Sequence, residues 1–182
     1  TGGIPESDKP GILALGLSPL SRKAGGAGNV RGGIIEYYIE NVVNAKSAYS
    51  VERYTSDQGV INTEQVLALD PDIIILPTSS GYHPPEELYS APYYQNLREL
   101  KAVKNKKVGA LTWTPCNCDA SRLEHPIDLM IIAKTAYPDR FADIKVHDWV
   151  LEFYQKVYGV DKETARRLRS AQWLDWMVEA DF

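Results

Sequence analysis

The 182-residue sequence contains only two cysteines, Cys116 and Cys118, with a single residue between them. Two cysteines cannot build a framework of several disulfide bonds. A bridge across one intervening residue would also be strained. Cysteine usage therefore excludes a disulfide-rich scaffold and leaves the redox compartment open.

Long apolar runs and a strong charge bias are also missing. No stretch approaches the eighteen apolar residues of a membrane-spanning helix. The formal net charge of −4 at pH 7 argues against nucleic acid as the main partner. Residues 1–10 are polar, rich in glycine and proline, and show no signal peptide, so we interpret them as a linker remnant.

Motifs for catalysis and nucleotide binding are scarce as well. The sequence has no G-x-S-x-G nucleophile elbow and no Walker lysine motif. Gly26, Gly28 and Gly32 have the spacing G-x-G-x-x-x-G instead of the G-x-G-x-x-G of a dinucleotide fingerprint. We therefore expect no catalytic residues and no intrinsic cofactor; a nucleotide-binding module stays an alternative that a fluorescent nucleotide titration would test.

Residues 61–77 are the most informative segment that is present. Asn62 can cap a helix, and Gln65 can reach back to it as in a capping box. Pro71 ends that helix. The apolar run from Ile73 to Leu76 is typical of a strand covered on both faces by helices.

Further predicted strands, at residues 12–17 and 107–112, alternate with predicted helices along the chain. Such alternation favours an α/β fold with a Rossmann-like, doubly wound and mostly parallel sheet flanked by helices. Residues 11–121 are predicted to form the α/β lobe. Residues 122–182 are predicted to be a C-terminal helical extension packed on the same lobe.

Four segments, in the same order, resemble the C-terminal lobe of the periplasmic substrate-binding proteins of ABC importers for siderophores, haem and vitamin B12. They are residues 9–15, residues 32–42, residues 62–77 and residues 96–108. The resemblance implies a two-lobed receptor whose N-terminal lobe is missing from this chain. It also implies a membrane permease as partner and a periplasmic or extracytoplasmic location, with a lipid anchor on the full-length protein as one option.

The resemblance further implies the ligand, a small-molecule metal chelate held in the cleft between two lobes. An iron-siderophore, haem or a corrinoid such as cobalamin is expected. No bond is made or broken in such a receptor, so the resemblance agrees with the expectation that the chain is not an enzyme.

In doubly wound sheets, ligands bind outside the carboxyl ends of the strands. This rule selects the loops at residues 18–33, 78–85 and 113–121. The residues that we predict to bind the ligand all lie in these three loops: Ser21, Arg22, Tyr82, His83, Trp113, Cys116 and Asn117.

Each of these side chains has a simpler interpretation beside the functional one. Arg22 can meet an anionic ligand or only water. His83 can coordinate iron or hydrogen-bond a ligand, or it can be an exposed histidine in a proline-rich loop. Trp113 can stack on a planar ligand.

The resemblance implies a different role for Glu64, which is contact with the permease. In the family, a glutamate at the matching position meets arginines of the permease, and charge-assisted bonds to a guanidinium suit that contact. The alternative is that Glu64 only complements the dipole of the helix that it begins.

Cys116 and Cys118 support a rival hypothesis, a cytosolic α/β thiol enzyme or redox protein. Cys116 could pair with His83 across neighbouring strand ends. Because no second cysteine pair exists elsewhere, no permanent metal site is predicted. Reactive, low-pKa thiols would favour the enzyme, and inert thiols the receptor.

Overall fold

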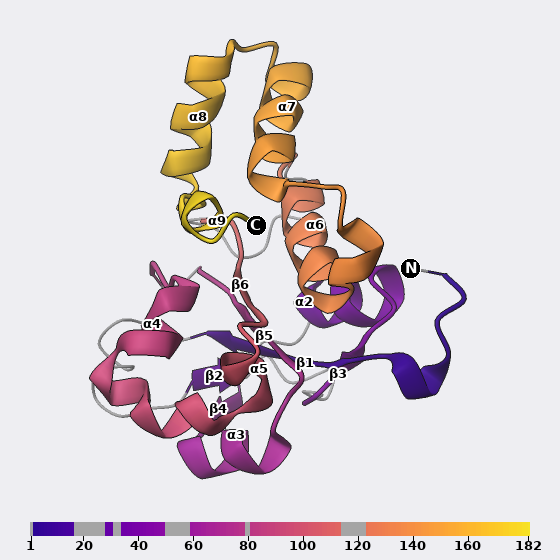
Figure 1. Ribbon diagram of the computed structural model, residues 1–182, viewed down its shortest axis with the longest axis vertical. Helices are drawn as coiled ribbons and strands as arrows, with labels where there is room; N and C mark the ends of the chain where they lie inside the picture. The colour runs from indigo at the N-terminus through magenta and orange to yellow at the C-terminus, as the bar shows by residue number, and fades with distance from the viewer. Residues whose placement is uncertain (1, 17–27, 31–33, 50–58, 79–80, 114–122) are drawn as a thin grey trace.

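Figure 1 shows the computed structural model of the chain. The residues that it describes are 2–16, 28–30, 34–49, 59–78, 81–113 and 123–182. Among them, no helix combines the length and the apolar character needed to cross a membrane.

The centre of the molecule is a parallel sheet of four strands. They are β1 (Gly11–Gly16), β3 (Lys46–Ser47), β5 (Ile73–Leu76) and β6 (Val108–Ala110), in the spatial order β3-β1-β5-β6. The strand order reverses at β1, which has β3 on one side and β5 on the other. The predicted doubly wound, mostly parallel α/β fold is confirmed.

An antiparallel ribbon extends this sheet, and the sequence did not predict it. It consists of β2 (Gly28–Val30) and β4 (Gly59–Ile61). β2 pairs with the last residues of β1, where Leu15 lies opposite Val30. β3 pairs with the first residues of β1 on the same edge. β2 and β3 therefore lie one after the other along one edge of β1.

Helices cover both faces of the sheet (Figure 1). One face carries α2 (Ile34–Tyr37), which continues into a π-helical turn at Tyr38–Val42, together with α6 (His125–Ala136). The other face carries α3 (Thr63–Leu69), α4 (Pro85–Ser90), the 3-10 helix Pro92–Glu99 and α5 (Lys101–Lys104).

The predicted capping of α3 is confirmed in both directions. The Gln65 backbone N donates to Asn62 Oδ1 at 2.8 Å, and the Asn62 backbone N donates to Gln65 Oε1 at 2.9 Å. The helix ends at Asp70, whose φ of 37° is left-handed. Pro71 then prevents further helix, and the buried strand β5 follows.

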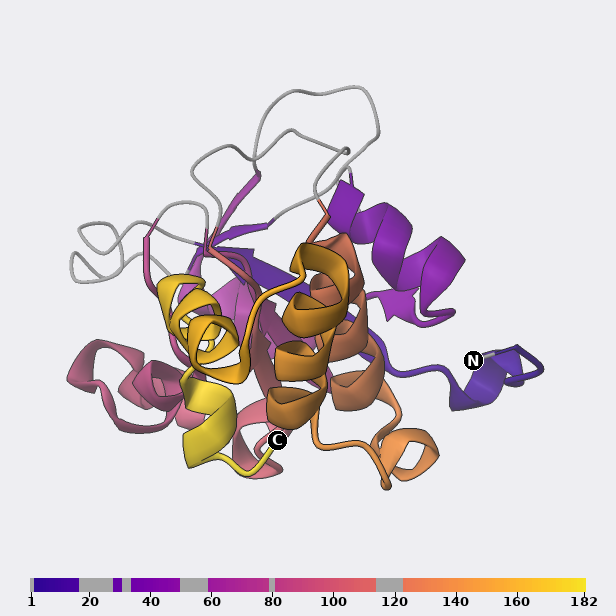
Figure 2. The same ribbon diagram turned by 90° about the horizontal axis from the view of Figure 1, so that it is seen from above.

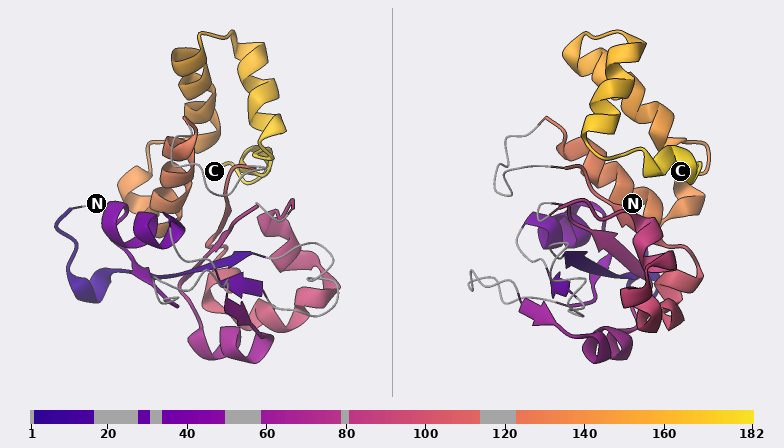
Figure 3. Two further views of the ribbon diagram at one scale, coloured as in Figure 1. Left: turned by 180° about the vertical axis from the view of Figure 1, so that it is seen from behind. Right: turned by 90° about the vertical axis from the view of Figure 1, so that its left-hand side faces the viewer.

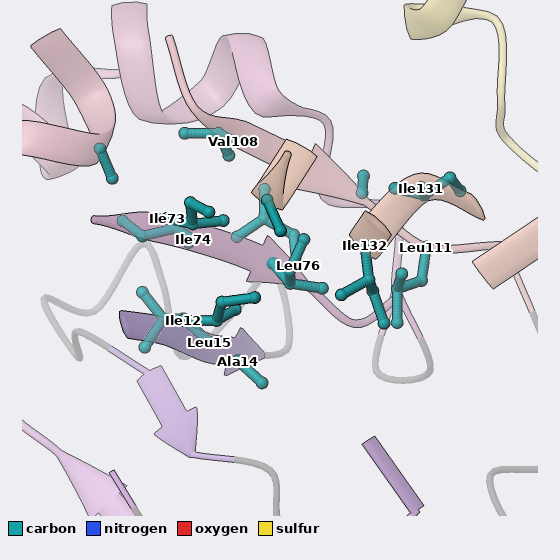
Figure 4. Close-up of a cluster of buried hydrophobic side chains, with 14 of the residues drawn as sticks. Ile12, Ala14, Leu15, Ile73, Ile74, Leu76, Val108, Leu111, Ile131 and Ile132 are labelled. Carbon is teal, nitrogen blue, oxygen red and sulfur yellow. The ribbon is translucent and has the colours of Figure 1, made fainter. Parts of the chain in front are cut away.

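The core lies where β1 and β5 meet the helices of both faces (Figure 4). Its strand residues are fully buried, among them Ile12, Leu13, Ile74 and Leu76. Removing one such side chain from water is worth about 1.5–3 kcal/mol. The continuous apolar runs are therefore explained by burial on both faces.

α6 lies within the predicted helical extension, yet it forms one layer of the sandwich. A Cβ on Gly109 of β6 would stand 3.0 Å from Thr135 Oγ1 and 3.1 Å from Ile131 Cγ2. Thr112, beyond the end of β6, is bonded to Asp128 near the start of α6. α6 therefore runs antiparallel to β6 at very close range.

The rest of the extension is α7 (Val146–Tyr158), α8 (Lys162–Ala171) and α9 (Trp176–Glu179). α7 and α8 form a hairpin that projects away from the sheet (Figures 1 and 3). Gly159 ends α7 with a φ of 66°, and the Asp161 side chain caps α8 by accepting from the Thr164 backbone N at 2.7 Å.

Residues 172–182 then run along the outer edge of β6. Their first residue accepts a 3.1 Å hydrogen bond from the Trp113 backbone N, past the carboxyl end of β6. Their last residue, Phe182, accepts from the His147 backbone N at 3.1 Å and lies near Lys134 in the last turn of α6. We call residues 172–182 the edge segment.

Candidate functional site

The reversal of strand order places the candidate ligand site at the carboxyl ends of β1, β5 and β6. Four of the predicted ligand-binding residues lie outside the described residues: Ser21, Arg22, Cys116 and Asn117. Tyr82, His83 and Trp113 are described, as is Glu64.

Tyr82 and Trp113 come from neighbouring loops and meet at a third aromatic residue. The ring centroids of Trp113 and Trp173 are 5.1 Å apart, and those of Tyr82 and Trp173 are 5.4 Å apart. We call these three residues the aromatic cluster. Tyr82 is 43% exposed and the two tryptophans are partly buried, so the cluster presents aromatic surface outside the carboxyl ends of β5 and β6.

Trp173 was not among the predicted site residues, because it lies sixty residues from Trp113 in the sequence. It belongs to the edge segment and has a left-handed φ of 59°. A bulky residue rarely adopts this conformation, and such strain often occurs at functional sites. One signal was available in the sequence, the pair Trp173 and Trp176 near its end, but nothing in it indicated the direction of their rings.

A buried network fixes the loops that carry the cluster. Thr78, after β5, donates its hydroxyl to the Thr112 carbonyl oxygen at 2.7 Å. The Thr112 backbone N and hydroxyl donate to Asp128 Oδ1 at 2.9 and 2.8 Å. Both threonines and Asp128 are buried, so these bonds tie two site loops to α6. Trp113 directly follows Thr112, which these hydrogen bonds hold in place.

The described part of the site has a negative electrostatic environment. Burial raises the pKa of Tyr82, and the carboxylates of Glu179, Asp175 and Glu87 raise it further, in that order. The Tyr82 phenol is therefore neutral at physiological pH and can serve as a hydrogen-bond donor. The expected cationic partner for an anionic ligand, Arg22, lies outside the described residues.

His83 does not lie where the sequence analysis expected it. Its side chain is fully buried, its ring stacks on Tyr94 at 5.8 Å, and its Nε2 lies 3.2 Å from the Tyr94 hydroxyl. Glu87 Oε2 lies 3.6 Å from the same nitrogen. In this arrangement His83 anchors the loop beside Tyr82 and neither faces a ligand nor stands exposed, because its ring fills the interior behind α4.

Glu64 lies apart from the cluster, in the first turn of α3. It is exposed and has no ion-pair partner among the described residues. Its carboxylate is therefore accessible to a partner, and its position in the first turn also complements the helix dipole. Both interpretations from the sequence stay open.

Metal ligands do not cluster in the described part of the chain. No group of three or more histidine, cysteine or acidic side chains there could hold a metal ion. His125 packs edge-on against Tyr38 at 5.5 Å, and His147 Nδ1 lies 2.9 Å from the Phe182 carbonyl oxygen. Both histidines thus have structural contacts.

No protein-family model matches the sequence, and no curated protein matches it either. Solved structures do match the fold. A periplasmic solute-binding protein from Veillonella parvula is 21% identical, with a TM-score of 0.69, and the match covers 99% of this chain and 51% of that protein.

Two further structures agree. An ABC-transporter solute-binding protein from Sulfurospirillum deleyianum has 21% identity and a TM-score of 0.63, over 87% of this chain and 46% of that one. Helicobacter pylori CeuE with bound Ni(II) has 18% identity and a TM-score of 0.57, over 88% of this chain and 48% of that one.

The chain therefore has the fold of part of an ABC-transporter solute-binding protein and spans about half the length of these structures. The likeness to this class that the sequence predicted is confirmed for the fold. Because the Veillonella match covers nearly the whole chain, it includes the helical extension as well as the sheet.

Proposed function

We propose that this chain is one lobe of the solute-binding receptor of an ABC importer. The observation that carries the proposal is the fold match over 99% of the chain to half of a solute-binding protein. A second lobe of similar size would complete such a receptor. The proposed location is periplasmic or extracytoplasmic, and the proposed partner is a membrane permease.

The aromatic cluster supports a role in binding. It lies where a doubly wound sheet receives its ligands, and the Thr78–Thr112–Asp128 network holds its loops rigidly. A preformed aromatic surface loses little conformational entropy when a ligand stacks on it. The receptor acts by trapping its ligand between two such surfaces, without a catalytic step.

The proposed ligand is a metal chelate with a flat or aromatic face, such as haem, a corrinoid or an iron-siderophore. Tyr82 and the two tryptophans would contact the apolar face of the ligand. The carboxylates around Tyr82 disfavour a polyanion at this end of the site. An anionic group would instead be directed to Arg22, in the loop after β1.

Titration of the full-length receptor with haem, cobalamin and ferric siderophores, followed by absorbance and tryptophan fluorescence, tests this proposal. Replacing Trp173 with glycine keeps the left-handed backbone and removes the ring. Loss of a stacking tryptophan should weaken binding about 30-fold. Trp149→Ala on α7 is the matched control, because Trp149 packs on Phe153 outside the cluster. Equal affinity in both variants would refute the role of the cluster.

Glu64 is the proposed contact with the permease. Glu64→Arg should abolish uptake by the full-length system while ligand affinity stays unchanged, since the residue is exposed and distant from the cluster. Glu40→Arg, at another exposed helical glutamate, is the control and should leave uptake unchanged. Normal uptake with Glu64→Arg would exclude the docking role.

The alternative, a thiol enzyme, has less support. The proposed base, His83, is buried, and its Nε2 lies against the Tyr94 hydroxyl. Thiol titration separates the two functions: a low-pKa, fast-reacting cysteine that loses reactivity in His83→Gln would favour the enzyme.

A further inference from the structure

A second candidate site lies at the opposite end of β6. A cavity of about 560 Å³ opens between α4, the turn before β6, the last turn of α6 and the end of the edge segment. Figures 1 and 2 show α9 next to α4 in this region, with the chain end close by. We call this cavity the edge pocket. Its volume falls in the range of small-molecule sites, about 300–1,000 Å³.

One buried polar group of the edge pocket has no hydrogen-bond partner among the described residues. Trp176 lines the pocket and is only 5% exposed, and its indole Nε1 has no hydrogen-bond partner among the described residues. A buried N–H without an acceptor is costly, and native proteins keep few of them. A ligand oxygen in the pocket would satisfy this donor.

Positive charge lies at one side of the same pocket. Lys106 and Lys107 line it, and neither forms an ion pair with the described residues. Lys106 has a left-handed φ of 54°, a conformation that suits glycine. A lysine at this turn is unfavourable for the backbone, and it places an ammonium group where an anionic ligand could use it.

Three aromatic side chains also line the pocket: Tyr89, Trp176 and Phe182. The rings of Trp176 and Phe182 lie 5.1 Å apart, and Tyr89 borders the pocket from α4. Lys134 Nζ donates to the carbonyl oxygens of Phe141 and Ile144, so two of its three N–H donors are already used. Glu86 and Glu179 also line the pocket and limit the negative charge that it can accept.

We propose that the edge pocket binds a small aromatic monocarboxylate. Its ring would lie against Trp176, Phe182 and Tyr89. Its carboxylate would accept from the indole N–H of Trp176 and from the ammonium groups of Lys106 and Lys107. The two glutamates select against di- and triphosphates and other polyanions. The proposal is independent of the receptor function, because the pocket is at the far end of β6 from the aromatic cluster.

The test uses the ¹⁵N-labelled chain and 2-naphthoate as the probe, with 2-naphthamide as a neutral control of the same shape. The indole N–H signal of Trp176, identified through Trp176→Phe, should shift downfield and saturate with naphthoate. The signals of Trp113 and Trp173 should not move. Naphthamide should bind about tenfold more weakly because it lacks the charge.

Three variants complete the test. Trp176→Phe keeps an aromatic ring at this position and removes the N–H donor, and it should weaken naphthoate binding about tenfold. Lys106→Gly should weaken binding about threefold without lowering the melting temperature, so it stays informative if the tryptophan variant folds poorly. Lys162→Met, at an exposed lysine on α8, should change nothing.

Several results would overturn the proposal. These are a linear, non-saturating shift of the Trp176 signal, equal binding of naphthamide, unchanged affinity in Lys106→Gly, or shifts confined to Trp113 and Trp173. The last result would assign the probe to the aromatic cluster instead.

Discussion

β5 and β6 are hydrogen-bonded neighbours with equally buried residues, yet the chain surrounds them in different ways. β5 lies between two strands, and α5 and α6 contact it. β6 ends the described sheet, and the edge segment, more than sixty residues later, covers its outer edge. Both candidate sites lie along β6, one at each end. An edge strand that is covered by a distant segment of the chain can therefore have a site at each end, whereas the central strand β5 is enclosed by its neighbours.

The largest expected effect tests the central strand. Ile74→Ala should destabilise the protein by about 3–4 kcal/mol, because Ile74 is fully buried and the cavity cannot collapse between two strands. Denaturant unfolding measures this change. Val157→Ala, at a 45% exposed residue of α7, is the control and should change stability by less than about 0.5 kcal/mol.

At the carboxyl end of β6, Asp128→Ala should cost about 2–3 kcal/mol. It leaves the buried backbone N–H and the hydroxyl of Thr112 without their acceptor. Asp128→Asn keeps one acceptor oxygen and should recover much of the loss. Equal destabilisation by both substitutions, measured by chemical denaturation, would show that the network does not secure this end.

In the middle of β6, Gly109→Ala should cost about 1–2 kcal/mol. The added methyl would stand 3.0 Å from Thr135 Oγ1 and 3.1 Å from Ile131 Cγ2, closer than most Cβ contacts in proteins, so these neighbours would have to shift. Adding Thr135→Ala, which removes the Oγ1 that would stand 3.0 Å from the new Cβ, should recover part of the loss. No loss of stability in Gly109→Ala would mean that α6 packs on β6 less closely than the distances of 3.0 and 3.1 Å indicate.

At the amino end of β6, Lys106→Gly should stabilise the protein by about 0.5–1 kcal/mol. Glycine adopts the left-handed φ of 54° without steric cost. A higher melting temperature together with weaker naphthoate binding would show that Lys106 lowers the stability of the protein while its charge contributes to binding. A lower melting temperature would contradict the backbone argument.

The smallest effect concerns Tyr89, which borders the start of β6. Burial, and to a lesser extent Glu86, raises the pKa of Tyr89 from 10.0 to about 12. The folded state therefore favours the neutral phenol. Its contribution to stability is complete below pH 10 and is lost as the pH rises through 12. Unfolding at pH 9 and pH 11 should show a modest decrease that Tyr89→Phe removes; an unchanged decrease in that variant would point to other groups.

Much of the fold could be predicted from neighbouring residues. The capping box of Asn62 and Gln65, the stop at Pro71 and the buried run of β5 are all interactions within a few positions of each other. The ribbon of β2 and β4 could not be predicted, because it pairs segments about thirty residues apart in strands of three residues. Short strands have too little pattern to specify a partner.

The candidate site shows the same division. Trp113 and Tyr82 each contact Trp173 past the strand ends, which agrees with the expectation that parallel strands bring their loops to one edge. His83 was misplaced, because the direction of its ring depends on contact with Tyr94. Trp173 was missed, because its neighbours in space are far away in sequence.

By itself, the sequence determined the alternation of helices and strands, the parallel sheet and the edge of that sheet where loops gather. These follow from periodicity, capping and the direction of the strands, all of which act over short distances along the chain. Only the tertiary structure decided what residues 172–182 cover, which rings meet there, and which indole N–H has no acceptor in the described part of the chain. Such contacts join residues that are far apart in the sequence, and they depend on the packing of side chains in three dimensions.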